Sequence, residues 1–455
     1  MLEEGRVPVK LQTDSDKVFT VSELVPRDLP VYKLKDYDSE DIIGSFYDAD
    51  IQKIRECVKS ELDLFTVPYT QTGIEKSIYV EVLPLSALSE VAPLEFLIPG
   101  NGEDYLDLNN TLLHVRCKIV TADGTNPAPV AKVAFVNYPI AGLFSQVDVI
   151  LGDHLISQSS SLYPYSAIFK GLLNYSNEAL NSQFAEDLFY KDTANEHENT
   201  ALDGPNEGFK KGNGYTAQGK TVELLRHIHS DLFFQEKLIQ NGVDVRIKMV
   251  QSKNEFCLMP GDAECYKVNI LSANLFVKKV KVSAAVKLGH AHALTSSNAK
   301  YPVERVNMKV LSMPAGIRVC TQENLFLGQL PKYVVIGMVD NDAFLRDYAR
   351  KPFNFKDNNV EFLALYLDGE QIPTKPFQPN FANDNTTREY YNLVLSSGKN
   401  LKDLPLAISC TDFSRGYTLF AFDLTPDQEC GDYFSLMKTG NMRFEVCFRQ
   451  PFPIL

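Results

Sequence analysis

Apolar and polar residues alternate along much of the chain. Clear examples lie at residues 113–119, 243–249 and 442–448, where an apolar side chain fills every second position. Successive side chains of a β-strand point to opposite faces of its sheet, so each of these segments has one apolar face and one polar face. This pattern is typical of antiparallel sheets that cover a core on one side. The same alternation predicts a strand at residues 306–310.

Helical patterns are few. The spacing of apolar residues in 168–173 predicts one short helix, and the polar start at 340–342 predicts a second helix that runs to Ala349. Strands and helices do not alternate regularly, which argues against a doubly wound α/β sheet. The segments 190–222 and 373–390 are rich in Asn, Gly, Pro and Thr, and they are predicted to be surface loops.

A weak internal repeat predicts that the fold is duplicated. Residues 149–156 resemble residues 365–372, both reading as a strand, a tight turn and a strand. Residues 241–248 resemble residues 440–447, both reading as a turn and an alternating strand, and the two pairs occur in the same order. The repeat implies two similar β-sandwiches in tandem, and their length suits jelly rolls with long loops. The joint between them is expected at residues 283–300.

The composition is that of a folded chain with an acidic balance. The 455 residues include 45 Lys and Arg against 58 Asp and Glu, a formal net charge of −13. This balance argues against broad nucleic-acid binding, which needs clustered positive charge. The longest apolar tract, residues 130–151, is interrupted by Lys132 and Asp148, so no membrane span is predicted.

The N-terminus and the cysteines both indicate an intracellular, reducing compartment. The first residues, MLEEG, lack the basic and apolar regions of a secretory signal, so we expect a protein that is not secreted. The eight cysteines are scattered, with no Cys-x-x-Cys pair. Cys117 and Cys447 lie inside apolar alternation and are predicted to be core thiols.

One segment matches a phosphate-binding loop. Residues Gly214 to Thr221 (GYTAQGKT) fit the pattern G-x-x-x-x-G-K-[ST], in which Lys220 would contact phosphate oxygens and Thr221 would bind magnesium. The pattern also needs an apolar strand directly before the loop, whereas residues 206–213 are polar. A flexible loop is therefore favoured, and a nucleotide-binding protein remains an alternative.

The histidine pairs do not complete a metal site. His227 and His229, and likewise His290 and His292, have a spacing found in metal sites, but no carboxylate or cysteine completes either set recognisably. No nucleophile elbow is present. The sequence therefore assigns no catalytic, cofactor-binding or metal-binding residue, and it predicts a protein that is not an enzyme and holds no cofactor.

Several short strings, taken in order, resemble one protein family: the double jelly-roll major capsid proteins of Polinton/Maverick elements and their adintovirus-like relatives. The likeness covers residues 60–280 well and 300–455 loosely, and Tyr69 stands where the family has proline. The strings are residues 61–65 (ELDLF), 70–76 (TQTGIEK), 94–100 (LEFLIPG), 105–108 (YLDL), 143–149 (LFSQVDV), 163–165 (YPY), 172–175 (LLNY) and 190–192 (YKD).

The resemblance implies a structural protein. Members of this family fold as two fused jelly rolls and form trimers that tile an icosahedral shell. The expected partners are therefore further copies of this chain, as a homotrimer and then a capsid shell with minor capsid proteins, and the expected location is the virion. A jelly-roll carbohydrate-binding protein is a second alternative, because lectins share this architecture and fold does not fix function. It would need an aromatic platform on one loop face.

The N-terminal residues resemble something different. Residues 32–47, together with 51–53, resemble the C-terminal end of a retroviral-type integrase such as Polinton elements encode. Only the last strands of a small barrel would be present in residues 1–56, too few to bury a core. We therefore expect a mostly irregular, non-essential arm.

The predicted fold class is all-β, with two tandem jelly-roll sandwiches after the irregular arm. The predicted domains are the N-terminal arm at residues 1–60, a first jelly roll at 61–285, a linker at 286–300 and a second jelly roll at 301–455.

Overall fold

The computed structural model describes most of the chain after residue 70. Residues 1–71 and residues 72–455 form two compact units. The family-like string at residues 61–65 lies outside the described residues. The described residues are 8–11, 18–25, 31–35, 51–53, 71–89, 92–326, 328–345, 348–400, 404–426, 436 and 438–451.

The described part of the N-terminal unit forms one antiparallel sheet. Its strands are β1 (Pro8–Leu11), β2 (Val18–Val25), β3 (Val31–Lys35) and β4 (Ile51–Lys53), and they lie in the order β3-β2-β1-β4. We expected a mostly irregular arm, but four segments of this unit form paired strands. The likeness to an integrase barrel stays a prediction.

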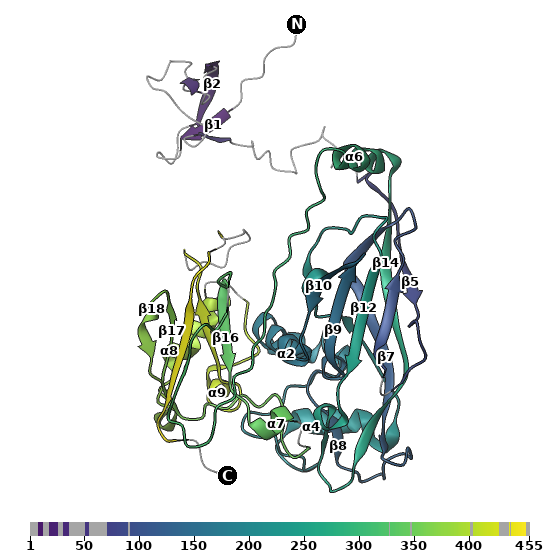
Figure 1. Cartoon of the computed structure of the whole chain (residues 1–455), viewed down its shortest axis with the longest axis vertical. Helices are drawn as coiled ribbons and strands as arrows, with labels where there is room; N and C mark the ends of the chain where they lie inside the picture. The colour runs from purple at the N-terminus through teal and green to yellow at the C-terminus, as the bar shows by residue number, and fades with distance from the viewer. Residues whose placement is uncertain are drawn as a thin grey trace. The chain divides into compact units, whose positions relative to one another are not determined.

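Two four-stranded antiparallel sheets form the first sandwich (Figure 1), in the orders β11-β7-β14-β5 and β10-β9-β12-β6. The alternating segments of the sequence lie in these strands and turn their apolar residues to the core, as at Val115 and Ile247, which are both fully buried. The strands are β5 (Ile74–Val82), β6 (Leu94–Ile98), β7 (Tyr105–Thr121), β9 (Phe144–Leu151), β10 (His154–Gln158), β11 (Val222–His227), β12 (Val245–Gln251) and β14 (Tyr266–Val282).

The strand order of the first sandwich is that of a jelly roll. When its eight strands are lettered B to I along the chain, one sheet reads B-I-D-G and the other C-H-E-F. Two short strands, β8 (Val133–Phe135) and β13 (Leu258–Pro260), pair separately. The first predicted sandwich is therefore confirmed from its own strand pairing.

Helices fill the long connection between β10 and β11. The predicted helix is present as α2 (Tyr163–Asn174). The prediction of a surface loop at 190–222 is wrong, because α4 begins at an N-cap formed by Asn206 and buries Phe209. The Asn, Gly, Pro and Thr residues of this segment are typical of turns, and they led to the prediction of a loop instead of a helix. The elements of the connection are α2, α3 (Asn177–Asn181), η2 (Ala185–Asp187), α4 (Glu207–Thr216) and η3 (Ala217–Gly219); elsewhere in this sandwich lie α1 (Pro139–Gly142), η4 (Asp231–Phe234) and α5 (Asn254–Cys257).

The second sandwich repeats the plan with fewer paired strands. Its larger sheet has the order β15-β20-β17-β18, which corresponds to C-H-E-F, and β16 pairs with β19 at positions D and G. Among the described residues no strand fills positions B and I. The strands are β15 (Val319–Gln322), β16 (Tyr333–Gly337), β17 (Val360–Leu367), β18 (Glu370–Phe377), β19 (Leu419–Asp423) and β20 (Met442–Phe448); the helices are α7 (Asn341–Leu345), η5 (Phe381–Asn383), α8 (Thr387–Ser396) and α9 (Cys410–Phe413).

Both repeated motifs fall on equivalent strands. The motif at 149–156 spans the turn between β9 and β10, and its counterpart at 365–372 spans the turn between β17 and β18, which are the E and F strands of each sandwich. The motif pair 241–248 and 440–447 leads into β12 and β20, the two H strands. The predicted duplication of the fold is confirmed by this correspondence.

Three local predictions in the second half need correction. Residues 306–310 form no strand, and Val306 and Val310 are about half exposed, so their alternation does not face a core. The segment 373–390 is not a loop throughout, because β18 runs to the buried Phe377 and α8 begins at Thr387. Helix α7 begins where predicted, but it does not reach Ala349, because residues 348–350 are not helical.

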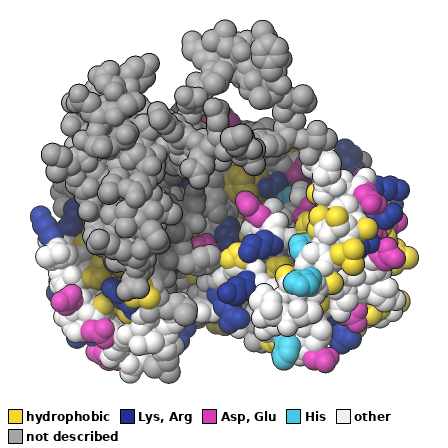
Figure 2. All heavy atoms as spheres, turned by 90° about the horizontal axis from the view of Figure 1, so that it is seen from above, with side chains coloured by type: hydrophobic (Ala, Val, Ile, Leu, Met, Phe, Trp, Pro, Cys, Tyr) yellow, Lys and Arg dark blue, Asp and Glu magenta, His cyan; other side chains and the backbone are white. Residues whose placement is uncertain are grey.

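The stretch that joins the sandwiches contains an exposed helix, α6 (Ala284–Leu294), which the sequence did not predict. Ser283 caps its N-terminus by accepting a hydrogen bond from the backbone N–H of Val286. None of its residues is buried, and Leu288 is 71% exposed. Figure 2 shows hydrophobic and histidine side chains next to each other on the end of the molecule seen from above. The predicted boundaries at residues 60, 285 and 300 stay predictions.

Candidate functional site: the joint between the two sandwiches

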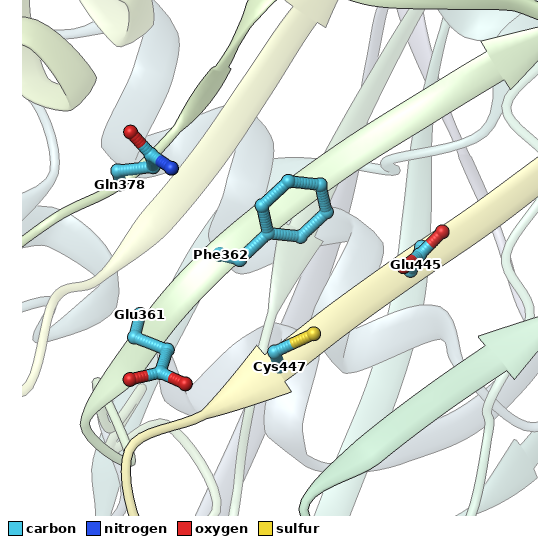
Figure 3. A pocket seen from close by; sticks show the side chains of 5 residues that line it. All are labelled: Glu361, Phe362, Gln378, Glu445 and Cys447. Carbon is cyan, nitrogen blue, oxygen red and sulfur yellow. The ribbon is translucent and has the colours of Figure 1, made fainter.

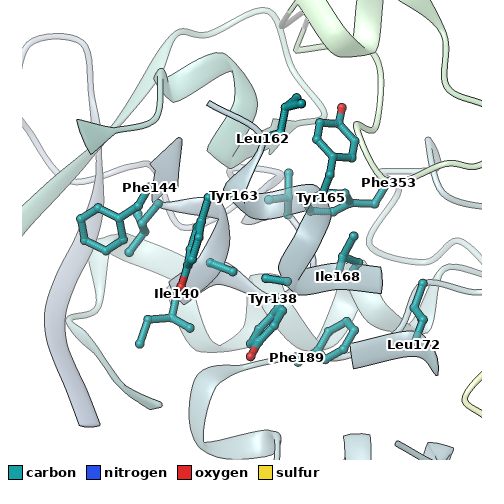
Figure 4. Packing of buried hydrophobic residues seen from close by; sticks show 14 of the residues in the cluster. Tyr138, Ile140, Phe144, Leu162, Tyr163, Tyr165, Ile168, Leu172, Phe189 and Phe353 are labelled. Atoms are coloured by element: carbon teal, nitrogen blue, oxygen red, sulfur yellow. The ribbon is translucent and has the colours of Figure 1, made fainter. Parts of the chain in front are cut away.

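Aromatic side chains connect the two sandwiches through α2. Tyr165 and Phe169 lie on α2, and they contact Phe353 and Phe355 in the segment before β17, with ring centroids 5.6 Å and 5.2 Å apart. Figure 4 shows Phe353 next to Tyr165 in the cluster around α2. Both phenylalanines are at most 2% exposed. Burying a side chain of this size contributes about 1.5–3 kcal/mol, so this contact fixes the second sandwich to the first.

A buried ion pair lies in the same joint. The Nζ atom of Lys351 is 3.0 Å from Oδ2 of Asp192, and the two side chains are 1% and 0% exposed. Asn137 and Asn206 donate hydrogen bonds to the same carboxylate, at 2.6 Å and 3.0 Å. A buried carboxylate and ammonium are tolerated only when they are paired and their remaining hydrogen-bonding capacity is used. The segment that carries Lys351 is therefore held in one place on the first sandwich.

Lys191 makes a second crossing contact beside the first. Its Nζ atom donates to Oδ2 of Asp412 at 2.6 Å and to the carbonyl of Ala407 at 2.6 Å, and it lies 4.4 Å from the ring centre of Tyr417. Burial lowers the pKa of the Lys191 ammonium, although Asp412 opposes that change. Tyr417 in turn donates to the carbonyl of Asp192 at 2.8 Å. Adjacent residues of the first sandwich thus bind separate parts of the second.

His197 is a buried histidine in this joint. Its ring lies 4.7 Å from that of Tyr417, and neither ring nitrogen has a hydrogen-bond partner among the described residues. Burial, with the nearby charges of Lys351 and Lys191, lowers the pKa of His197 to about 4, against the opposing charge of Asp192. The imidazole is therefore neutral at pH 7.

The rim of the joint carries more exposed ion pairs. Arg350 donates to Glu198 at 2.8 Å, and the Nζ atom of Lys356 lies 3.8 Å from the other oxygen of the same carboxylate. These side chains are 30–43% exposed, and exposed pairs of this kind contribute about 0–1 kcal/mol. The ion pairs at the rim therefore help to orient the two sandwiches, and the buried groups contribute most of the stability of the joint.

The sequence predicted no site residue, and it did not predict this joint. One signal was available: the string YKD at 190–192 contains both Lys191 and Asp192. Nothing around Lys351 in the sequence marks it as buried, because lysine is usually exposed. Its partner lies 159 positions away along the chain, and only the fold brings the two together.

The phosphate-loop match has the wrong structural context. Residues 214–216 end helix α4, residues 217–219 form η3, and strand β11 follows. A phosphate-binding loop needs the reverse order, with a strand before the loop and a helix after it. The segment is also not a simple loop tip, because Thr216 and Gly219 are buried while Lys220 is exposed.

One histidine of each pair contacts a tyrosine hydroxyl group. His229 is buried and hydrogen-bonds the hydroxyl of Tyr138, and burial lowers its pKa well below the ordinary value. His290 on α6 contacts the hydroxyl of Tyr105 at 2.9 Å. In the part of the chain that the structure describes, no three His, Cys, Asp or Glu side chains gather in an arrangement suited to a metal ion. None of the described helices is long and apolar enough to cross a membrane.

A pocket of about 330 Å³ lies on the larger sheet of the second sandwich (Figure 3). Glu361, Phe362, Gln378, Glu445 and Cys447 line it. The prediction of Cys447 as a core thiol is wrong, because its place in the alternation is opposite the core face of β20 and it is only half-buried.

Cys117 is a core thiol, as predicted. It is fully buried, and burial raises its pKa to about 12. A buried thiol with a raised pKa is chemically inert.

The comparisons with known proteins give distant relatives. No family model matches the sequence. The chain is 24% identical over 405 residues to uncharacterized protein F54H12.2 of Caenorhabditis elegans, which covers 85% of this chain and 93% of that protein.

Several of the similar solved structures are viral. A chain of the Sputnik virophage structure shares 14% identity with a TM-score of 0.49, covering 87% of this chain and 86% of that one. The mavirus major capsid protein shares 10% identity with a TM-score of 0.42, covering 88% of each chain. The faustovirus major capsid protein shares 10% identity with a TM-score of 0.41, covering 85% of this chain and 89% of that one.

Proposed function

We propose that this protein is the major capsid subunit of a Polinton/Maverick or adintovirus-like element. In this proposal it acts as a structural protein, forms a homotrimer and assembles into a shell with minor capsid proteins. The observation that carries the proposal is the repetition of the C-H-E-F sheet within one chain, with the two sandwiches held together by a buried joint.

The joint suits a building block. A shell subunit must keep the angle between its two sandwiches when neighbouring subunits press on it. The ion pair of Asp192 and Lys351 and the aromatic contacts on α2 restrict that angle from several directions. An enzyme or a signalling switch would more often place a mobile cleft at such a boundary.

The strings that resemble the capsid family lie at structural positions that define this architecture. Residues 94–100 contain β6, residues 105–108 begin β7 and residues 143–149 lie on β9. Residues 163–165 begin α2, and residues 190–192 supply the joint. The resemblance and the double sandwich therefore support the same proposal through the same residues.

The test is the assembly state of the purified full chain. We expect light scattering to give three times the mass of one chain, and negative-stain images to show trimers with a six-sided outline or closed particles. A chain that stays monomeric at high concentration and over a range of salt would contradict the proposal.

The proposed domain boundaries can be tested together with assembly. Deleting residues 1–56 should leave both sandwiches folded and the trimer intact. Deleting residues 1–76 should cost stability, because strand β5 begins at Ile74 and pairs with β14. Equal loss in both truncations would place the boundary earlier than proposed.

A further inference from the structure

A cleft of about 730 Å³ lies beside the edge strand β11. Its walls come from η2, from the end of α4 and from the start of β11. Both helical walls belong to the long connection between β10 and β11, outside the eight strands of the sandwich. The residues that line it are Ala185, Glu186, Leu188, Gly214, Tyr215, Lys220, Thr221, Val222 and Glu223.

An aromatic platform stands in this cleft. Tyr215 is stacked on Tyr190, with ring centroids 5.8 Å apart and planes 7° from parallel, and the two hydroxyls are 3.2 Å apart. Lys211 lies over the Tyr190 ring at 5.2 Å. Tyr215 is still 50% exposed, so Tyr190 supports its ring while part of the side chain stays accessible to a ligand. A supported tyrosine loses little conformational entropy when a flat apolar surface stacks on it.

The polar groups around the platform suit hydroxyl groups. Glu186 is held by Arg226 at 3.0 Å, and Glu223 contacts His114 at 2.5 Å. Each glutamate side chain is more than half exposed, which leaves carboxylate oxygens for further donors. A carboxylate accepts several hydrogen bonds, while Thr221 and Lys220 can donate.

The same charges disfavour an anionic ligand. The lining side chains include two carboxylates and one lysine, while Arg226 is already paired with Glu186 and Lys211 lies over Tyr190, so a phosphate or a sulfated sugar would meet like charge in the lining itself. The reversed order of helix and strand also removes the amide cradle that a nucleotide needs. A neutral ligand with an apolar face and many hydroxyls fits better.

We propose that this cleft is a binding site for neutral glycans, in which the pyranose ring stacks on Tyr215 and its hydroxyls donate to Glu186 and Glu223. The proposal goes beyond the structural role above and does not depend on it, because none of the residues that line the cleft takes part in the contacts of the joint.

Binding can be measured on the purified full chain by saturation-transfer NMR and by titration. The probes are maltotriose, lactose and N,N′-diacetylchitobiose, with Mg·ATP and a short single-stranded oligonucleotide as anionic probes. We expect at least one neutral probe to bind, with ring protons receiving the strongest transfer. Tyr215→Ala should weaken that binding at least tenfold, while Tyr215→Phe should stay within about threefold.

Matched controls separate the cleft from a general effect. Tyr391 on α8 is 55% exposed, close to Tyr215, so Tyr391→Ala should leave binding unchanged. Glu223→Gln keeps an acceptor and should weaken binding less than Glu223→Ala does. The proposal is overturned if no neutral probe binds, if Tyr215→Ala and Tyr391→Ala behave alike, or if only an anionic probe binds.

Discussion

The two sandwiches follow one strand plan but differ in how they complete it. The first closes both of its sheets with four strands each, whereas the second pairs β16 and β19 as a two-stranded sheet. Two strands alone are marginally stable, and they need cover on their faces. The smaller sheet has that cover from α8, which packs on β19, and from the joint, where Phe169 lies near Gly337. The comparison indicates that the second sandwich depends on the first for part of its core.

The largest expected effect comes from breaking the buried ion pair. Asp192→Ala removes the partner of Lys351 and the acceptor of two hydrogen bonds from asparagine amides, and an uncompensated buried charge typically costs about 3–5 kcal/mol. Hydrogen exchange should show β16 and β19 losing protection before β7 and β14. The double change Asp192→Leu with Lys351→Met should restore much of the melting temperature. Equal loss of protection in both sandwiches would contradict the inference that the second sandwich depends on the first for part of its core.

A smaller loss of stability is expected from a substitution at Gly337, whose backbone packs closely against side chains of the joint. A Cβ there would lie 2.9 Å from both Leu419 Cδ2 and Phe355 Cδ1. Gly337→Ala should therefore lower stability by about 1–3 kcal/mol, the usual cost of overpacking. Gly289 in α6 has no atom within 4 Å of such a Cβ, so Gly289→Ala should be neutral or stabilising. Thermal unfolding of the two variants would show whether crowding at the joint matters.

His197 should give the joint a pH dependence of its own, which a variant at this position isolates from that of the other buried groups. Its folded pKa of about 4 lies below the unfolded value of 6.5, so the unfolded chain binds more protons between these values. The stability contribution is complete above pH 6.5 and is lost as the pH falls toward 4. From pH 7 to 5.5 the loss should be about 1 kcal/mol relative to His197→Gln. Parallel denaturation curves for wild type and variant across this range would show that protonation of His197 does not weaken the joint.

The smallest effect is expected at Lys220 in the first sandwich. It is exposed and lies outside any phosphate cradle, so Lys220→Ala should change stability by less than about 0.5 kcal/mol. Mg·ATP should not raise the melting temperature of the wild type, because a ligand stabilises the native state only by binding it. A rise that disappears in Lys220→Ala would restore the nucleotide interpretation.

Local alternation was enough to predict the sheets and the duplication. Residues 113–119 and 442–448 became strands because a period of two matches the geometry of a sheet with one buried face. The same rule was wrong at 306–310, where Val306 and Val310 are exposed, since alternation alone does not say that a core is within reach.

The joint and the cleft could not be predicted in the same way. Lys351 and Asp192 are far apart in sequence, and their burial depends on the packing of two complete sandwiches. Tyr190 and Tyr215 meet only because α4 folds back within a segment whose composition indicated a loop. Contacts of this kind depend on tertiary structure, which no local pattern contains.

The burial of Lys351 has a use in the laboratory. A primary amine reacts with an acylating reagent only when the reagent can reach it, and this amine is 1% exposed in the closed joint. Its rate of acylation, relative to that of the exposed Lys220, therefore reports how often the two sandwiches separate under native conditions. Peptide mass spectrometry of briefly labelled protein would measure the extent of acylation at Lys351, and from it the rate at which the joint of a subunit opens.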